Sequence, residues 1–125
     1  MTKIPTIAVV DDDDEIRRSL SSLIRSLGYS VRTYRSAVEF LGEAGGDPDC
    51  MIADIQMPQM TGDQLQAKLI ATGRVFPMIL MTAFPTDAVR DRVMAAGACA
   101  FIAKPYDGET ISRCLQAALD PAHRP

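Results

Sequence analysis

Cysteine is scarce in this chain and shows no pairing pattern. The three residues Cys50, Cys99 and Cys114 are odd in number, and no C-x-x-C occurs. That spacing argues against a disulfide framework and against a structural zinc site. We therefore expect three reduced, buried thiols that behave as small hydrophobes in a cytoplasmic protein.

Long hydrophobic runs and an excess of basic residues are also missing. No apolar run approaches the ~20 residues that cross a bilayer, and the start MTKIPTIAVV reaches four aspartates before a signal-peptide core could form. Lys and Arg total 13 against 16 Asp and Glu, a net charge of −3. Because duplex binding depends on a basic face, we expect this chain to contact neither nucleic acid directly nor a membrane.

The composition is typical of a folded, soluble globular protein. The chain has 125 residues, of which 47% are hydrophobic and 23% charged, enough for one domain with one core. It has no internal repeat and no internal linker. We place the domain at residues 1–120 and interpret residues 121–125 as a C-terminal tail or the start of a linker.

Five short apolar runs alternate with helical patterns along the chain. This order predicts an α/β fold with a doubly wound, five-stranded parallel sheet and five helices. Four of the runs are continuously apolar, as in strands buried on both faces, whereas Ser30–Tyr34 alternates and belongs at an edge. The predicted strands are Thr6–Val10, Ser30–Tyr34, Cys50–Ala53, Pro77–Met81 and Cys99–Ala103.

The helical segments predict which side chains face the core. The first helix runs from about Asp14 to Gly28, and we expect the arginines off its apolar face to be solvated. These are Arg17, Arg18 and Arg25. The short second helix is expected to bury Val38, Leu41 and Phe40.

Polar residues gather where the predicted strands end. Asp11 and Asp12 follow the first strand, and Asp54 ends the third. Thr82 ends the fourth strand, and Lys104 follows the fifth. Because the carboxyl ends of parallel strands share one rim, where open α/β sheets bind ligands, we expect these five side chains to meet.

Three crowded carboxylates need a cation, since each raises the pKa of the others. One lysine cannot balance three acids, and hard oxygen ligands suit Mg²⁺ or Mn²⁺. A metal-holding acid pair beside Asp54, with a hydroxyl and an ammonium opposite, is suited to phosphoryl transfer to a carboxylate.

Together these motifs resemble the receiver domain of two-component response regulators. The resemblance spans about residues 5–119 and is closest to the FixJ-like group, whose receivers precede a LuxR-type DNA-binding domain. The motifs that carry it are VVDD at 9–12, DIQMP at 54–58, Thr82-Ala83 and Lys104-Pro105, and those that point to the FixJ-like group are MPQMTG at 57–62 and AGACAFIAKP at 96–105.

The resemblance implies a flavodoxin-like strand order 2-1-3-4-5 and a role for each acid. Asp54 is implied to be the phosphoacceptor. Asp12 is implied to ligate Mg²⁺ directly, and Asp11 mainly through water. The backbone carbonyl of Gln56 is implied to be a further ligand, and Asp54 itself belongs to the metal site. The Gln56 side chain is implied to tune the lifetime of the phosphate.

The remaining implied roles concern the switch. Thr82 and Lys104 would contact the phosphoryl oxygens. Phe101 would turn inward when Thr82 moves, although core packing explains Phe101 equally well. Phe84 would tune the phosphate lifetime by shielding the acyl phosphate from water, and the bond before Pro105 is expected to be cis.

The resemblance also implies partners. A sensor histidine kinase would donate the phosphoryl group, and the surface of about residues 87–119 would then favour a homodimer or a new effector contact. Transcriptional output would need an effector domain outside this chain. The protein would promote its own phosphorylation and slow dephosphorylation without being a turnover enzyme.

Two other functions fit parts of the pattern. A haloacid-dehalogenase-like phosphatase also uses an Asp nucleophile with Mg²⁺, but it needs a second acid two residues later, where this chain has Gln56. A phosphorylation-independent interaction module on the same fold would not need three clustered acids beside Thr82 and Lys104.

Overall fold

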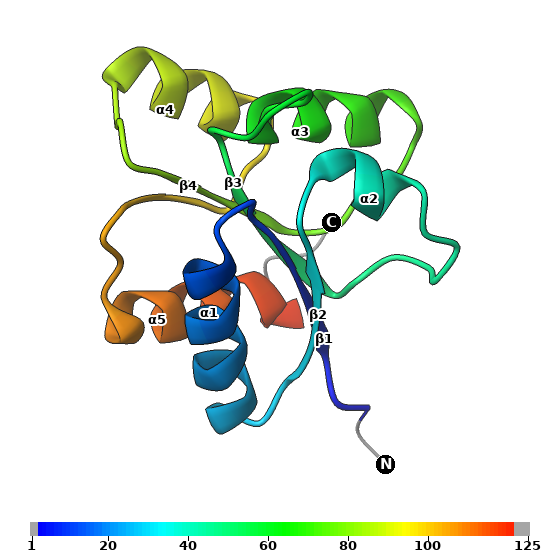
Figure 1. Ribbon diagram of the computed structural model, residues 1–125, viewed down its shortest axis with the longest axis vertical. Helices are drawn as coiled ribbons and strands as arrows, with labels where there is room; N and C mark the ends of the chain where they lie inside the picture. The colour runs from blue at the N-terminus through cyan, green and yellow to red at the C-terminus, as the bar shows by residue number, and fades with distance from the viewer. Residues whose placement is uncertain (1–2, 122–125) are drawn as a thin grey trace.

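The computed structural model describes residues 3–121 and confirms the predicted α/β fold (Figure 1). Five parallel strands lie in the order β2-β1-β3-β4-β5. The last four residues of the predicted tail, 122–125, lie outside the described part. The elements are β1 (Thr6–Val10), α1 (Asp14–Ser26), β2 (Ser30–Tyr34), α2 (Ala37–Leu41), β3 (Cys50–Asp54), α3 (Gly62–Ala71), β4 (Met78–Thr82), α4 (Asp87–Ala95), β5 (Ala100–Ala103) and α5 (Gly108–Leu119).

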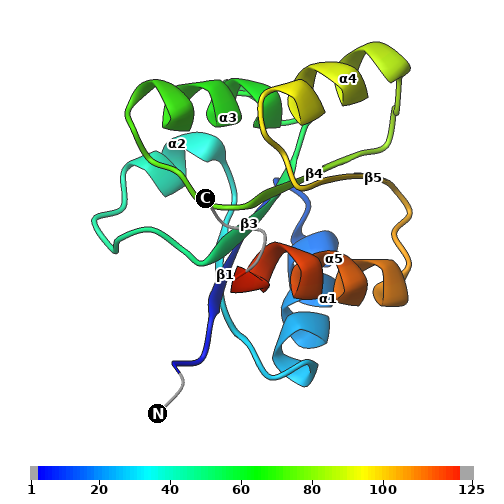
Figure 2. The same cartoon turned by 180° about the vertical axis from the view of Figure 1, so that it is seen from behind.

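Helices cover both faces of the sheet. In Figures 1 and 2, α2, α3 and α4 lie on one face and α1 and α5 on the other. Side chains of a strand alternate between faces, so Ala8 and Val10 pack in the α2–α4 layer while Ile7 and Val9 pack in the α1–α5 layer. The sheet is therefore the wall between two apolar clusters.

Burial along the strands follows their place in the sheet. Every residue of β3 and β4 is buried, and in β2 only Tyr34 is. The central strands have neighbours on both sides and helices on both faces, whereas β2 is an edge strand, as its alternating sequence predicted. The residues that end β3 and β4 are consequently held by packed backbone.

Side-chain caps start the helices close to the strand ends. The Asp13 carboxylate accepts hydrogen bonds from the N–H groups of Glu15 and Ile16, at 2.9 and 3.3 Å. Thr61 and Gln64 form a reciprocal capping box at the start of α3. The caps fix where α1 and α3 begin, so the loops after β1 and β3 are short. The polar side chains of these loops therefore stay near the carboxyl ends of the strands.

Four burial predictions are wrong, those for Cys99, Cys114, Val38 and Leu41. Cys50 is buried, but Cys99 is exposed and Cys114 is half-buried. Cys99 comes just before β5, which is an edge strand and pairs with β4 on one side only. Fewer neighbours therefore cover Cys99.

In α2, Val38 is 51% exposed and Leu41 is half-buried, because the five residues of α2 form little more than one turn, which directs Ala37 and Phe40 inward. The predicted burial of Phe40 is confirmed.

Within residues 3–121, no helix combines the length and the apolar character that crossing a membrane requires.

At Gly62, the first residue of α3, the helix backbone passes close to the backbone of Asp54. A Cβ on Gly62 would lie 2.4 Å from the backbone oxygen of Asp54, so that Gly62→Ala must displace either the end of β3 or the start of α3. We expect a loss of about 2 kcal/mol in the free energy of unfolding, measured by urea denaturation.

Gly42→Ala is the matched control for this substitution. Its Cβ would meet nothing nearer than the Val38 oxygen, at 3.4 Å, and we expect a change below about 1 kcal/mol. Equal losses in the two variants would contradict the close approach of α3 to Asp54.

Candidate functional site

The loop after β1 brings the first two acids to the rim in different environments. Asp11 is 2% exposed, whereas Asp12 faces solvent. The Asp11 carboxylate accepts a hydrogen bond from the Asp13 N–H at 2.9 Å, and its backbone oxygen accepts one from Arg17 at 2.7 Å. The loop thus holds Asp11 rigidly and leaves Asp12 free to turn toward a ligand.

Arg17 corrects the prediction of a solvated arginine face. Its side chain is only 12% exposed and also pairs with Asp14. The guanidinium folds back over the loop because two oxygen acceptors lie there, the Asp11 carbonyl and the Asp14 carboxylate. Arg17 therefore supports the backbone of the acid pair, a role that helical periodicity could not indicate.

Lys104 joins the two buried acids. Its ammonium nitrogen lies 3.0 Å from Asp11 Oδ2 and 3.3 Å from Asp54 Oδ1. Asp54 is 4% exposed, and its Oδ1 is in ion-pair range of Lys104 but accepts no well-directed hydrogen bond in the described structure. Strands that are far apart in the sequence thus place two acids and one ammonium together, as their positions after the strands predicted.

Burial controls the ionisation of these groups. Burial raises the pKa of Asp54 to about 6, the nearby Asp11 carboxylate raises it as well, and Lys104 partly opposes both. Burial works to lower the pKa of Lys104, but the hydrogen bond and charge of Asp11, together with Asp54, raise it above its ordinary value. Lys104 therefore stays an ammonium. Its charge only partly balances the negative charge of the ionised Asp54 carboxylate.

The cluster fits a hard divalent cation. One carboxylate oxygen from each of Asp11, Asp12 and Asp54 lies within 4.8 Å of the others. All three donors are oxygen, which is the chemistry that Mg²⁺ and Mn²⁺ prefer. The poorly satisfied Oδ1 of Asp54 is a second sign that this pocket lacks positive charge.

Thr82 is fully buried at the end of β4 and makes contacts that sequence reasoning missed. Its hydroxyl donates to Gln56 Oε1 at 2.6 Å and accepts from the Phe84 N–H at 3.0 Å. The position of Thr82 was predictable from the strand end, but its partner depends on a side-chain rotamer. Only the short separation between Gln56 and Asp54 in the sequence could have indicated the contact.

The remaining predicted residues are Phe84, Phe101 and Pro105. Phe84 is 72% exposed. Phe101 is half-buried and packs against the α2–α4 side of the core. The Lys104–Pro105 peptide bond is cis.

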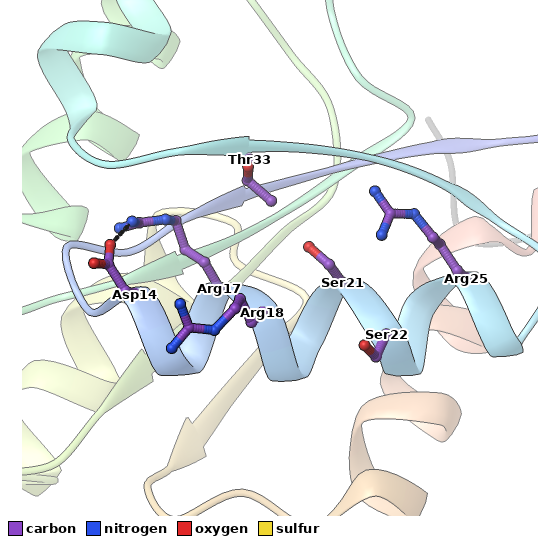
Figure 3. Close-up of a pocket in the computed structure, with 7 residues that line it drawn as sticks. All are labelled: Asp14, Arg17, Arg18, Ser21, Ser22, Arg25 and Thr33. Atoms are coloured by element: carbon purple, nitrogen blue, oxygen red, sulfur yellow. Dashed lines mark hydrogen bonds and ion pairs between the residues drawn. The ribbon is translucent and has the colours of Figure 1, made fainter.

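A separate hollow of about 320 Å³ runs along α1, and Asp14 and Arg17 are among the residues that line it (Figure 3). In Figure 3, Arg17 extends toward Asp14, and Arg25 reaches toward β2. None of the rim residues Asp54, Thr82 and Lys104 lines it. The hollow is therefore distinct from the acidic site.

Comparison with known proteins shows similarity to response regulators. The family model of the response regulator receiver domain matches residues 7–116. The chain is 35% identical over 114 residues to the response regulator protein TmoT of Ectopseudomonas mendocina, covering 90% of this chain and 52% of TmoT. It is 36% identical over 115 residues to the transcriptional regulatory protein FixJ of Azorhizobium caulinodans, covering 90% and 54%. The chain thus spans about half the length of these relatives.

Solved structures agree with this result. The response regulator StyR superposes with a TM-score of 0.85 at 34% identity, covering 94% of this chain and 60% of StyR. The structure called FixJ-N superposes with a TM-score of 0.85 at 29% identity, covering 97% of both chains. The similarity therefore extends over nearly the whole of this chain.

Because the pKa of Asp54 is raised, replacing Asp54 by a neutral side chain should increase the free energy of unfolding. The size of this increase should depend on pH. In the unfolded chain the carboxyl loses its proton near pH 4, but in the folded, metal-free protein it does so only near 6. Stability supplied by the protonated form is lost as pH rises through this window. At pH 7.5, the free energy of unfolding of Asp54→Asn should therefore exceed that of wild type by up to about 3 kcal/mol. The variant should accordingly unfold at a higher urea concentration.

The measurement is urea denaturation of both proteins in chelator at a series of pH values. The gap between variant and wild type should shrink as pH falls from 7 to 4, because wild-type Asp54 becomes neutral. A gap that is constant over this range would show that Asp54 has an ordinary pKa in the folded state.

Proposed function

The chain belongs to the receiver domain family of response regulators, and on that premise we propose that it is a phosphorylation-dependent switch with Asp54 as its phosphoacceptor. A receiver is a signalling domain of two-component systems, not a turnover enzyme. The observation that carries the proposal is the position of Lys104 Nζ, within 3.3 Å of Asp54 and 3.0 Å of Asp11. This position supports the proposal, because an ammonium beside Asp54 can neutralise charge on a phosphoryl group attached there.

In the proposed step, an Asp54 carboxylate oxygen attacks the phosphorus of a kinase phosphohistidine. The new O–P bond forms as the P–N bond breaks, and the imidazole leaves with the electron pair. With a pKa of about 6, Asp54 is mostly ionised at neutral pH and available as the nucleophile. Lys104 and Thr82 would contact the equatorial oxygens.

Magnesium or manganese would be held by carboxylates of Asp11, Asp12 and Asp54 and by the backbone carbonyl of Gln56. A bound dication supplies charge neutralisation at the phosphoryl oxygens. The exposed Asp12 can adjust to it, and the buried Asp11 is already oriented by the loop.

The proposed response is a change on the surface formed by α4, β5 and α5. Thr82 would move toward the phosphate and Phe101 would follow it inward. Support comes from the shallow burial of α4, in which Val93 is the one buried residue, and from Phe101, which is half-buried. A shift of a few kcal/mol is enough to change the dominant state.

We propose that this surface controls a homodimer or an effector contact, with a sensor histidine kinase as donor. The similar proteins include FixJ, a transcriptional regulatory protein of about twice the matched length. We therefore propose an effector domain outside residues 1–120, transcriptional output through it, and a cytoplasmic location, with residues 121–125 as a tail or linker start.

The alternative functions are weaker. A haloacid-dehalogenase-like phosphatase needs an acid at position 56, where an exposed glutamine donates no proton to a leaving group. A phosphorylation-independent module gives no reason for two acids to be buried around one lysine, because such burial costs free energy. Turnover of a generic phosphate ester would favour the phosphatase.

Acetyl phosphate with Mg²⁺ tests the proposal directly. We expect intact mass spectrometry to show one added phosphate on wild type and none on Asp54→Asn, because the amide cannot attack phosphorus. Asp49→Asn is a matched control, an acid just before β3, and should gain phosphate like wild type. Phosphate on Asp54→Asn would show that another residue is the acceptor.

Phe84→Ala tests the proposed shielding of the acyl phosphate. If the exposed ring closes over phosphorylated Asp54, its removal should speed dephosphorylation about threefold or more, a modest loss of protection from water. The decay is followed by intact mass after removal of acetyl phosphate. Val75→Ala, another exposed apolar side chain at 74% exposure, should decay like wild type, and equal decay of all three proteins would refute the shielding.

A further inference from the structure

The hydroxyl of Thr82 already donates one hydrogen bond and accepts another in the unphosphorylated protein. It donates its proton to Gln56 Oε1 at 2.6 Å and accepts the Phe84 N–H at 3.0 Å. Thr82 has no exposed surface, so water is not a competing partner. The two hydrogen bonds therefore define one resting orientation of this side chain.

A hydroxyl has only one proton to donate. If Thr82 is to donate to a phosphoryl oxygen at Asp54, the bond to Gln56 must first break. Gln56 stands two residues beyond Asp54 and is exposed, so its amide can exchange Thr82 for water at little cost. The resting contact and the phosphoryl contact are thus mutually exclusive.

We infer that the side chain of Gln56 is a latch that holds the Thr82 hydroxyl in its resting orientation and competes with the phosphoryl group for it. This inference rests on the proposed function and assigns Gln56 a positioning role through Thr82. It differs from tuning hydrolysis, because the latch acts on the conformational equilibrium before water attack.

Release of the latch also affects the loop before α4. When Thr82 turns away, the Phe84 N–H loses its acceptor. Phe84 lies between β4 and α4, whose N-cap is Thr86. The same movement that satisfies the phosphate therefore loosens the segment leading into α4, which connects the latch to the responding surface.

The test uses beryllofluoride, a non-covalent mimic of the phosphoryl group, with saturating Mg²⁺. Its equilibrium affinity is measured by amide NMR titration and does not depend on hydrolysis. Gln56→Ala keeps the backbone carbonyl but removes the latch, and it should bind the probe about threefold to tenfold tighter than wild type, the effect of one net hydrogen bond.

A double-mutant cycle with Thr82 separates the latch from other effects of Gln56. In the Thr82→Val background, which has no hydroxyl to hold, Gln56→Ala should change the affinity less than about twofold. Thr82→Ser keeps the hydroxyl and should keep most of the gain, so the cycle remains informative if Thr82→Val folds poorly. Gln116→Ala, an exposed glutamine on α5, should match wild type.

Two results would overturn the latch alone: unchanged or weaker binding by Gln56→Ala, or an equal gain with and without the Thr82 hydroxyl. Failure of wild type to bind beryllofluoride and to take up phosphate from acetyl phosphate would instead overturn the proposed function, and the latch with it. The two failures are distinguished by the wild-type protein itself.

Discussion

The site depends on one electrostatic imbalance: two buried carboxylates share a single ammonium. Asp11 and Asp54 are at most 4% exposed, and Lys104 contacts both. Burying like charges costs free energy unless positive charge accompanies them. The fold tolerates this cost at one rim because the central strands β3 and β4 are buried along their whole length. In the function we propose, a dication and a phosphoryl group would enter this pocket together and interact with its unbalanced charge.

The parallel sheet supplies the positional accuracy that this imbalance requires. Asp54 and Thr82 end the fully buried strands β3 and β4, and Gly62 lets α3 start against the Asp54 backbone. Groups beyond the strand ends are held more loosely: Asp12 and Phe84 face solvent. Fixed acids beside adjustable partners are what a two-state signalling site needs.

The strand ends could be predicted from the sequence, and with them the meeting of Asp11, Asp54 and Lys104. Continuous apolar runs identify buried parallel strands, and topology then places their carboxyl ends together. What could not be predicted depends on rotamers or on single turns. The Gln56–Thr82 bond and the inward fold of Arg17 are side-chain choices among several acceptors. The exposure of Val38 and Cys99 reflects a very short helix and an edge strand, where periodicity gives little information.

The central claim is that three carboxylates form one site for a divalent cation, and a calorimetric Mg²⁺ titration tests it most directly. Wild type should bind one Mg²⁺, and Asp11→Asn should weaken binding by about tenfold or more, the effect of losing a charged contact. Asp13→Asn, whose side chain caps α1 outside the cluster, should stay within about threefold of wild type. Equal affinity in all three proteins would contradict the account.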